Sequence, residues 1–176
     1  SGTGSNLKNL IIFSKTKKSP ISIDLIISNT IKAKGLKFAN QYQIKKKIFN
    51  FKDIKTTEKK LFLSLKKNKI KFICLAGFMK ILSSKFIKQF NGKIINIHPS
   101  LLPRYKGLNT HSRAIQNKDK FSGCTVHYVT EKLDSGKIIM QKKIKILKKD
   151  TPSSLARKIL KQEHKIYPKA ILKIFN

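Results

Sequence analysis

The sequence is poor in several features, and each shortage excludes a class of protein. Only two cysteines occur among the 176 residues, Cys74 and Cys124, and their separation matches neither a CxxC pair nor a zinc-binding spacing. This favours two free thiols in a reducing cytoplasm over a disulfide scaffold or a metal centre. The sequence contains no run of 18 apolar residues and no charged-then-apolar leader. It therefore predicts a protein that neither crosses a membrane nor is secreted.

Acidic residues are also scarce. Eight Asp and Glu stand against 40 Lys and Arg, which gives a formal net charge of +32. Only three of these basic residues are arginine (Arg104, Arg113 and Arg157), although the planar guanidinium is the group best suited to phosphates and guanine edges. The lysines are spread along the whole chain. This pattern favours compositional drift of exposed positions over a dedicated nucleic-acid surface, and it predicts non-specific binding of polyanions at low salt.

Apolar periodicity alternates between strand-like and helix-like segments, and no linker or repeat divides the chain. We therefore expect one domain over residues 1–176. Strands are expected at 21–28, 46–51, 70–77 and 94–98, followed by two antiparallel partners at 123–131 and 136–147. Helices are expected just after residue 6, at 32–42, 56–69, 83–90 and 110–118, and from residue 151 onward. This order predicts an α/β fold with an open, mostly parallel Rossmann-like sheet, helices on both faces and a late antiparallel strand pair.

The last helix has the clearest start signal. Thr151 is a good N-cap residue, and Pro152 suits the first helical position. An apolar stripe follows at Leu155, Ile159 and Ile166. We expect Glu163 near the rim of that stripe.

The segment NIHPSLLPRYKG (96–107) carries the strongest chemical signal. Asn96 and His98 are two residues apart at the end of an apolar strand, so their side chains point to the same face. In an open α/β sheet, polar groups at the end of a buried strand are typical of an active site. From spacing alone, catalysis and a structural His bound by loop carbonyls both remain open.

With LAGFMKIL (75–82) before it and HYVTEKLDSGKII (127–139) after it, NIHPSLLPRYKG resembles the 10-formyltetrahydrofolate-dependent formyl transferases. The order and spacing of the blocks match as well as their content. The opening SGTGSNL, the Thr-His pair at 110–111 and KQEHKIYP (161–168) look like the branch that formylates glycinamide ribonucleotide in de novo purine synthesis. The resemblance implies the formyltransferase fold, 10-formyltetrahydrofolate as the formyl donor, and no metal.

The resemblance also implies a mechanism without a nucleophilic side chain. The substrate amine attacks the formyl carbon, and Asn96 and a protonated His98 would stabilise the resulting oxyanion. Asp134, in LDSG, matches the carboxylate that the family pairs with this His, where it favours the charged imidazole and helps to place a water. By itself an Asp before Ser-Gly is a turn former. For His127, support of these groups and simple core packing both remain open.

Binding residues are carried over from the same motifs. Gly4, Ser5 and Asn6 would hold the substrate phosphate through backbone amides at a helix start. Glu163 would accept a hydrogen bond from the ribose hydroxyl. The folate pteridine would lie against Met79, Lys80, Ile81 and Leu82. Taken alone, the opening Ser-Gly-Thr run favours residues left over from cloning over a phosphate loop, whereas the downstream blocks favour the loop.

Two departures from the family stand out. The strand that precedes the phosphate loop in the family is absent, so we expect a longer natural chain with a further first strand. Family members usually carry a basic residue that meets the folate shortly before the 56–69 helix. In this chain that position aligns with Ile54, between Lys52 and Lys55, and the role stays unassigned. Three alternatives remain: a methionyl-tRNA formyltransferase-like enzyme, a formyltetrahydrofolate hydrolase, and a basic nucleic-acid-binding protein derived from the fold. Monomer and homodimer are both compatible with the sequence.

Overall fold

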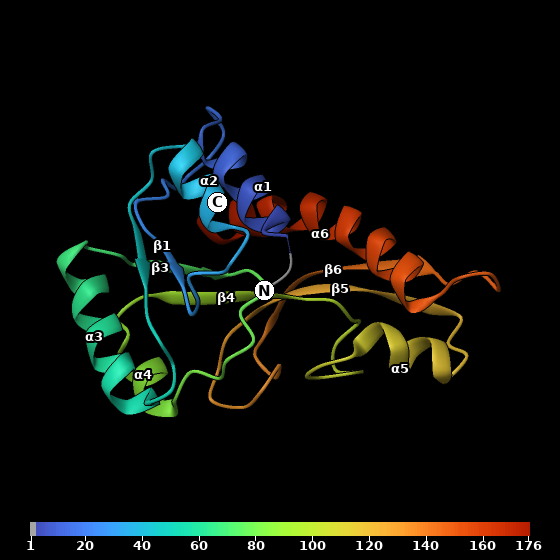
Figure 1. The fold of residues 1–176 in the computed structure, drawn as a ribbon. Helices are drawn as coiled ribbons and strands as arrows, with labels where there is room; N and C mark the ends of the chain where they lie inside the picture. Colours follow the sequence, from blue (N-terminus) through green and yellow to red (C-terminus); the bar gives the residue numbers. More distant parts are fainter. Residues whose placement is uncertain (1–2) are drawn as a thin grey trace. The chain divides into compact units, whose positions relative to one another are not determined.

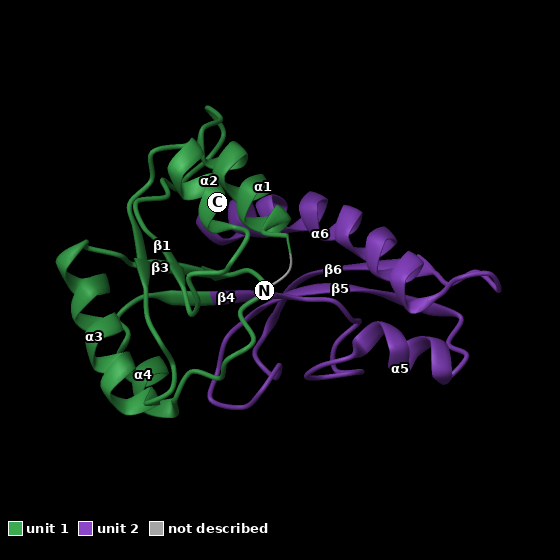
Figure 2. Cartoon of the chain, in the orientation of Figure 1, with its two compact units in different colours: residues 1–94 green, residues 95–176 purple. Residues whose placement is uncertain are grey.

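The computed structural model describes residues 3–176, which form two compact units (Figures 1 and 2). Unit 1 ends at Ile94, and unit 2 comprises Ile95–Asn176. Strand β4 (Lys93–His98) begins in unit 1 and continues in unit 2. Ser1 and Gly2, which open the predicted phosphate loop, lie outside the described residues. The expectation of a single domain stays a prediction.

Unit 1 alternates short strands with helices. Its strands are β1 (Ile26–Ser28), β2 (Lys46–Ile48) and β3 (Phe72–Leu75). Its helices are α1 (Ser5–Ser14), α2 (Leu36–Gln41), α3 (Ile54–Lys67) and α4 (Ser84–Gln89). β1 and β2 form a parallel pair, and β3 is the neighbour of β4 in a second sheet. One hydrophobic cluster of unit 1 contains Ile11, Ile26, Leu36, Phe38 and Ala39.

The strand expected at 21–28 is wrong over residues 21–25, since β1 begins only at Ile26. Its partner β2 spans Lys46–Ile48, so only three residues of each strand pair in the ladder. β2 is likewise shorter than the predicted 46–51. Apolar content alone therefore overestimates strand length where the partner strand is short.

Side-chain caps define the starts of α3 and α4. The Asp53 carboxylate accepts a hydrogen bond from the backbone N–H of Thr56 at 3.2 Å, so α3 begins at Ile54, two residues before the predicted start. Ser83 caps α4 in the same way. Ser83 also donates from its backbone N–H (2.7 Å) and its hydroxyl to the buried carboxylate of Glu58, which ties the start of α4 to α3.

The start of α1 depends on glycine. Gly4 precedes the helix with φ 78°, a left-handed conformation that favours glycine. A Cβ atom added there would lie 2.5 Å from the Cα of Gly35, so a larger residue would also clash with backbone. α1 has no side-chain cap, and it buries Leu10 and Ile11.

Unit 2 is built on antiparallel strands. It contains α5 (Thr110–Gln116), β5 (Phe121–Tyr128), β6 (Ile138–Lys145) and α6 (Pro152–Phe175). β4 pairs with β5 and β5 with β6, both antiparallel, and the β5–β6 register shifts between Val126 and His127. The late antiparallel pair is confirmed, and β4 is antiparallel to β5 as well. The α/β class with an open, mixed sheet is also confirmed.

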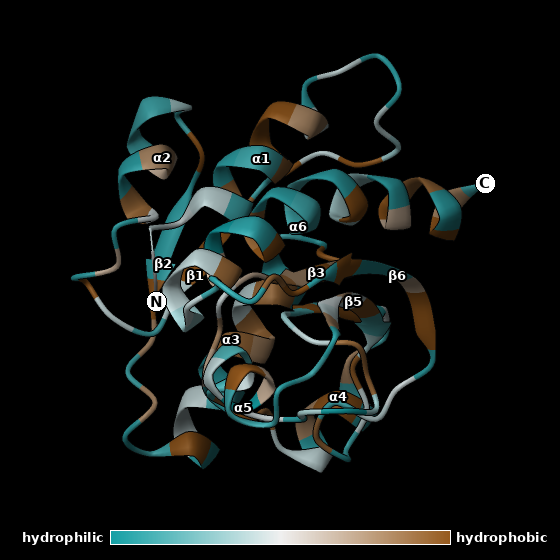
Figure 3. Ribbon diagram, turned by 90° about the vertical axis from the view of Figure 1, so that its right-hand side faces the viewer, coloured by the Kyte–Doolittle hydropathy of each residue, from teal (hydrophilic) through white to brown (hydrophobic). Residues whose placement is uncertain are grey.

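Helix α6 contacts β5 and β6. Hydrophobic and hydrophilic residues alternate along it (Figure 3), and Leu155 and Ile159 are fully buried. The Thr151 hydroxyl caps it by accepting from the backbone N–H of Ser154 at 3.1 Å. The prediction that Glu163 lies near the rim was wrong, because only 7% of this residue is exposed.

Asp150, one residue before the cap, anchors the same helix start. Its carboxylate accepts from the Lys158 ammonium at 2.7 Å and from the Leu147 backbone N–H at 2.8 Å. The hydrogen bond from Lys158, followed by the one from Leu147, lowers the pKa of Asp150 to about 2. Asp150 thus connects Leu147, in the chain between β6 and α6, to Lys158 of α6.

Among residues 3–176, no helix combines the length and apolar character needed to cross a membrane.

Candidate active site

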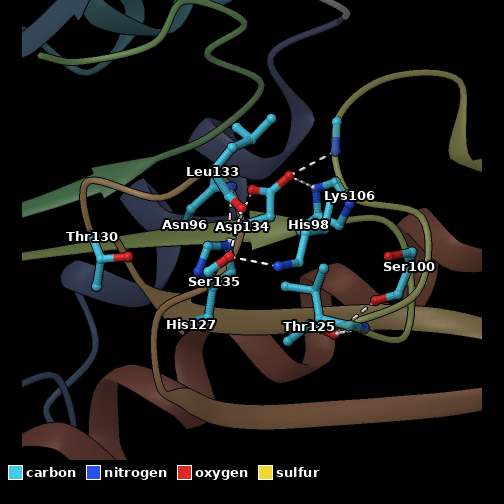
Figure 4. A network of polar contacts seen from close by, with 12 residues as sticks. Asn96, His98, Ser100, Lys106, Thr125, His127, Thr130, Leu133, Asp134 and Ser135 are labelled. Atoms are coloured by element: carbon cyan, nitrogen blue, oxygen red, sulfur yellow. Dashed lines mark hydrogen bonds and ion pairs between the residues drawn. The ribbon is translucent and has the colours of Figure 1, made fainter.

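β4 places Asn96 and His98 on one face of the unit 2 sheet (Figure 4). In the register with β5, Asn96 lies opposite His127 and His98 opposite Thr125. Because side chains alternate along a strand, residues two apart share a face, as predicted for this pair. His98 is buried and Asn96 is half-buried.

The Asp134 carboxylate joins the two histidines. Its Oδ2 lies 3.4 Å from Nδ1 of His98, and its Oδ1 lies 3.6 Å from Nε2 of His127. The backbone N–H of Gly107 donates to Oδ2 at 2.9 Å. Asp134 itself has φ 45°, a left-handed conformation that Asp tolerates better than most residues. The structure therefore brings His98 and Asp134 into direct contact, with Asn96 linked to them through His127.

The two ring nitrogens of His98 face different acceptors. Nε2 lies 2.8 Å from the carbonyl oxygen of Tyr105, so this nitrogen carries a proton and donates it. Nδ1 faces the Asp134 carboxylate. Burial lowers the pKa of His98 below its ordinary value of 6.5, while the Tyr105 carbonyl and the Asp134 charge oppose that change. The Tyr105 carbonyl thus fixes the proton on Nε2, and Nδ1 is the nitrogen whose protonation can change beside Asp134.

Asp134 is ionised at neutral pH. Burial alone would raise the pKa of this carboxyl group. The contact with His127, the hydrogen bond from the Gly107 backbone amide and the electrostatic influence of His98 outweigh burial and hold the pKa of Asp134 below its ordinary value. A stable negative charge thus sits beside Nδ1 of His98.

His127 is buried and also contacts the site. Its Nδ1 donates to the Tyr128 carbonyl at 2.8 Å, and its Nε2 lies 3.4 Å from Nδ2 of Asn96. A neutral His127 accepts from Asn96 at Nε2, whereas a protonated one forms an ion pair with Asp134. When His127 is neutral, this contact orients the Asn96 amide and leaves its second N–H for another acceptor. His127 is therefore buried and in contact with both Asn96 and Asp134, and its support of catalysis stays a prediction.

The loop that carries Asp134 relies on a close backbone approach. A Cβ atom on Gly136 would lie 1.8 Å from the carbonyl oxygen of Tyr128, which no side chain can tolerate. The Tyr128 backbone N–H donates to the Lys137 carbonyl at 3.0 Å. Gly136 therefore lets the LDSG loop lie against the end of β5, which fixes the position of Asp134.

The start of the loop after His98 is held by Thr125 of β5. The Thr125 hydroxyl donates to the Ser100 carbonyl at 2.7 Å and accepts from the Leu102 backbone N–H at 3.1 Å. The Ser100 hydroxyl in turn donates to the Arg104 carbonyl at 2.6 Å. These buried bonds determine where the chain leaves β4.

Sequence reasoning missed the two backbone groups that complete the network, the Tyr105 carbonyl and the Gly107 N–H. Backbone groups leave no side-chain signal in a sequence. The glycine in PRYKG indicates a turn, but it does not indicate which side chain the turn will meet.

The phosphate and folate residues expected from the resemblance belong to unit 1. Ser5 and Asn6 form the first turn of α1, directly after Gly4. The folate segment lies between β3 and α4, where Met79 is 61% and Ile81 63% exposed. Lys80 is exposed as well, and Leu82 is buried.

Glu163 and Cys124 both lie inside unit 2. Burial, followed by the charge of Glu163, raises the pKa of the Cys124 thiol to about 12. Cys124 and Cys74 are both free, as predicted. Cys124 is therefore a protonated, unreactive thiol at neutral pH.

A surface cavity of about 380 Å³ in unit 1 contains none of the predicted site residues. It is lined by Lys47, Ile48, Phe49, Lys60, Leu63, Ser64 and Lys67. No group of three or more His, Cys, Asp or Glu that could hold a metal ion occurs among residues 3–176. The absence of a metal from the reaction stays a prediction.

Three histidines, one buried and two half-buried, should make stability fall with acidification. Burial lowers the pKa of His98, His111 and His164 from 6.5, so the folded state binds fewer protons than the unfolded state near and below that pH. Stability therefore falls as pH drops below about 6.5. We expect a lower urea midpoint at pH 5.5 than at pH 7.5, and a smaller difference in His164→Gln. Equal midpoints at the two pH values would contradict this prediction.

Comparison with known proteins identifies the family. The sequence model of the formyl transferase family matches residues 1–171, so the chain belongs to that family. It is 41% identical over 174 residues to phosphoribosylglycinamide formyltransferase of Haemophilus influenzae, covering 97% of this chain and 82% of that protein. The crystal structure of phosphoribosylglycinamide formyltransferase from Anaplasma phagocytophilum matches with a TM-score of 0.90 and 44% identity, over 97% of this chain and 80% of that one.

A larger relative contains a similar segment. The trifunctional purine biosynthetic protein adenosine-3 of Homo sapiens is 41% identical over 174 residues, which is 97% of this chain. The chain spans only 17% of that protein's length. The family expected from the motifs is thus confirmed.

Proposed function

We propose that the protein transfers a formyl group from 10-formyltetrahydrofolate to the amine of glycinamide ribonucleotide in purine synthesis. One observation carries the proposal: the ionised Asp134 joins His98 and His127 next to Asn96. This is a proton-handling and oxyanion-binding arrangement, in a chain similar over nearly its whole length to phosphoribosylglycinamide formyltransferases.

The roles of the catalytic residues follow from their partners. The substrate amine attacks the formyl carbon, and the carbonyl oxygen becomes an oxyanion. Asn96 donates its second amide N–H to that oxygen. The amine loses a proton, and Nδ1 of His98 accepts it, since Nε2 is already protonated and bound to the Tyr105 carbonyl. The resulting imidazolium lies beside Asp134 and donates a hydrogen bond to the oxyanion. The bond between the formyl carbon and the folate nitrogen then breaks, and that nitrogen takes up the proton from His98.

The substrate-binding roles rest on the family motifs. The first turn of α1, at Gly4, Ser5 and Asn6, binds the phosphate, because helix starts present backbone N–H groups to anions. Glu163 accepts from the ribose hydroxyl. The folate lies against the segment Met79, Lys80, Ile81 and Leu82, whose exposed Met79 and Ile81 offer apolar surface.

The whole chain acts as one formyltransferase domain in the cytoplasm, as a monomer or a homodimer. Its partners are the ribonucleotide and the folate, and its positive charge gives only salt-sensitive binding to nucleic acid. No step of the reaction requires a metal.

The test is a transfer assay with two acceptors. The protein is incubated with 10-formyltetrahydrofolate and either glycinamide ribonucleotide or charged initiator tRNA, and release of tetrahydrofolate is followed. We expect release with the ribonucleotide and none with the tRNA. Release only with tRNA would support the methionyl-tRNA formyltransferase alternative, and release without any acceptor would support the hydrolase. Inactivity combined with nucleic-acid affinity that survives physiological salt would support the binding-protein alternative.

A further inference from the structure

Tyr105 adopts a backbone conformation that needs support from its surroundings. Its φ is 55°, in the left-handed region that residues with side chains rarely occupy. In this conformation its carbonyl oxygen lies 2.8 Å from Nε2 of His98. The proposed catalytic histidine is therefore oriented by a strained residue, so the groups that hold Tyr105 in place matter for the site.

Four residues provide that support: Arg104, Arg113, Asn117 and Asp119. We name these four together with Tyr105 the Tyr105 clamp. The Tyr105 hydroxyl donates to Asp119 at 2.7 Å and accepts from the Asn117 amide at 2.8 Å. Arg104 donates to the other oxygen of Asp119 at 2.8 Å. The guanidinium groups of Arg104 and Arg113 lie 5.2 and 5.0 Å from the centre of the Tyr105 ring.

Asp119 is the central member of the clamp. Its side chain is only 9% exposed, and its two oxygens bind Arg104 and Tyr105 separately. Its backbone N–H donates to the Ala114 carbonyl at 3.1 Å, which fixes it to the end of α5. One carboxylate thus anchors the Tyr105 side chain to α5.

The clamp also holds the loop residue that precedes Gly107, the backbone donor to Asp134. Arg113 donates to the Lys106 carbonyl at 2.7 Å. The next residue, Gly107, donates its backbone N–H to Asp134 at 2.9 Å. The loop from Tyr105 to Gly107 therefore supplies both the acceptor for His98 and a donor for Asp134. The clamp holds this loop at Lys106, the residue between these two.

We infer that Asp119 and Tyr105 are positioning residues that keep the His98 proton on Nε2 and so make Nδ1 the nitrogen that exchanges a proton beside Asp134. A histidine whose one nitrogen donates to a carbonyl keeps its other nitrogen as the variable site. If Tyr105 moved, the neutral imidazole could carry its proton on either nitrogen, and only one form serves the reaction. The inference rests on the proposed function for its kinetic consequence, but the position of the proton on His98 is independent of it.

The experiment replaces the carboxylate by its isosteric amide. Asp119→Asn keeps the size of the side chain, but it removes the charge and offers only one acceptor oxygen to Tyr105 and Arg104. Asp150→Asn is the matched control, because Asp150 is an equally buried carboxylate in the same unit that pairs with Lys158. Tyr105→Phe removes only the hydroxyl and leaves the ring between the two guanidinium groups, so it tests the clamp even if Asp119→Asn does not fold.

The first readout is the ¹⁵N NMR spectrum of His98, assigned with His98→Gln. In the wild type we expect the neutral form with its proton on Nε2. In Asp119→Asn and Tyr105→Phe we expect a mixture of both neutral forms and a lower pKa for His98, because the Tyr105 carbonyl raises that pKa. Asp150→Asn should leave both unchanged. The other charged or titratable groups that act on His98 are common to all variants: Asp134, His127, His111 and Arg113.

The second readout is kinetic. Displacement of a catalytic group costs up to about 100-fold in rate, so we expect kcat in Asp119→Asn to fall by about 10- to 100-fold, with little change in KM for either substrate. A loss of stability with an unchanged His98 spectrum and unchanged kcat would overturn the inference, since the cluster would then only stabilise the loop. If the wild type does not transfer formyl to the ribonucleotide, the proposed function fails. The His98 spectrum then still decides the positioning role.

Discussion

Replacement of His98 by Ala is expected to lower kcat for formyl transfer by about 100- to 1,000-fold, with a much smaller effect on KM. In the proposed mechanism the mutation removes both the proton acceptor at Nδ1 and the positive charge that forms beside Asp134. It also leaves the Tyr105 carbonyl without its 2.8 Å partner. In that mechanism the effect falls on the transition state, because the positive charge on His98 forms as the amine loses its proton.

Steady-state kinetics with glycinamide ribonucleotide check this expectation. His164→Ala is the matched control, since His164 is a partly buried histidine of α6 outside the network around Asp134. We expect kcat of the control to stay within a few-fold of the wild type. Full activity in His98→Ala would remove His98 from the mechanism, even if the protein is a formyltransferase.

The largest expected effect on stability comes from the α6 core. Leu155 is fully buried, and truncation of such a leucine to alanine typically costs about 2–5 kcal/mol, from lost burial and the cavity left behind. Leu63, also in a helix, is 65% exposed. The same truncation there should change the free energy of unfolding by less than about 0.5 kcal/mol.

Urea denaturation of Leu155→Ala and Leu63→Ala measures this difference. Both variants lose the same atoms from a helical leucine, so helix propensity cancels and the difference reports burial. Similar unfolding free energies for the two variants would mean that α6 is not part of the cooperative core of unit 2.

Local signals in the sequence predicted much of what the structure shows. Thr151 and Pro152 start α6 as expected, because N-cap chemistry acts over three residues. The alternation along residues 94–98 placed Asn96 and His98 on one face, since a strand's period does not depend on its partners. Such features are encoded within a few residues.

Features that depend on residues distant in the sequence were harder to predict from the sequence. The start of α3 depends on a cap at Asp53, which lies ahead of the helix start expected at residue 56. The burial of Glu163 depends on packing against other elements, which the helical stripe does not reveal. The Tyr105 clamp joins residues up to 15 positions apart through a loop and a helix end, so no spacing rule indicates it.

Most of the few acidic residues, and not only Asp134, have a defined structural role. Among them, Asp53 caps α3, Glu58 ties α4 to α3, Asp119 anchors Tyr105, Asp134 joins two histidines and Asp150 holds the start of α6. Five of the eight acidic residues, in a chain with 40 basic ones, thus accept specific hydrogen bonds that hold the fold or the site together. The consequence is an asymmetry in tolerance to substitution. Exchange of an exposed lysine removes one of many similar charges, whereas loss of any of these five carboxylates removes a specific hydrogen-bonding contact.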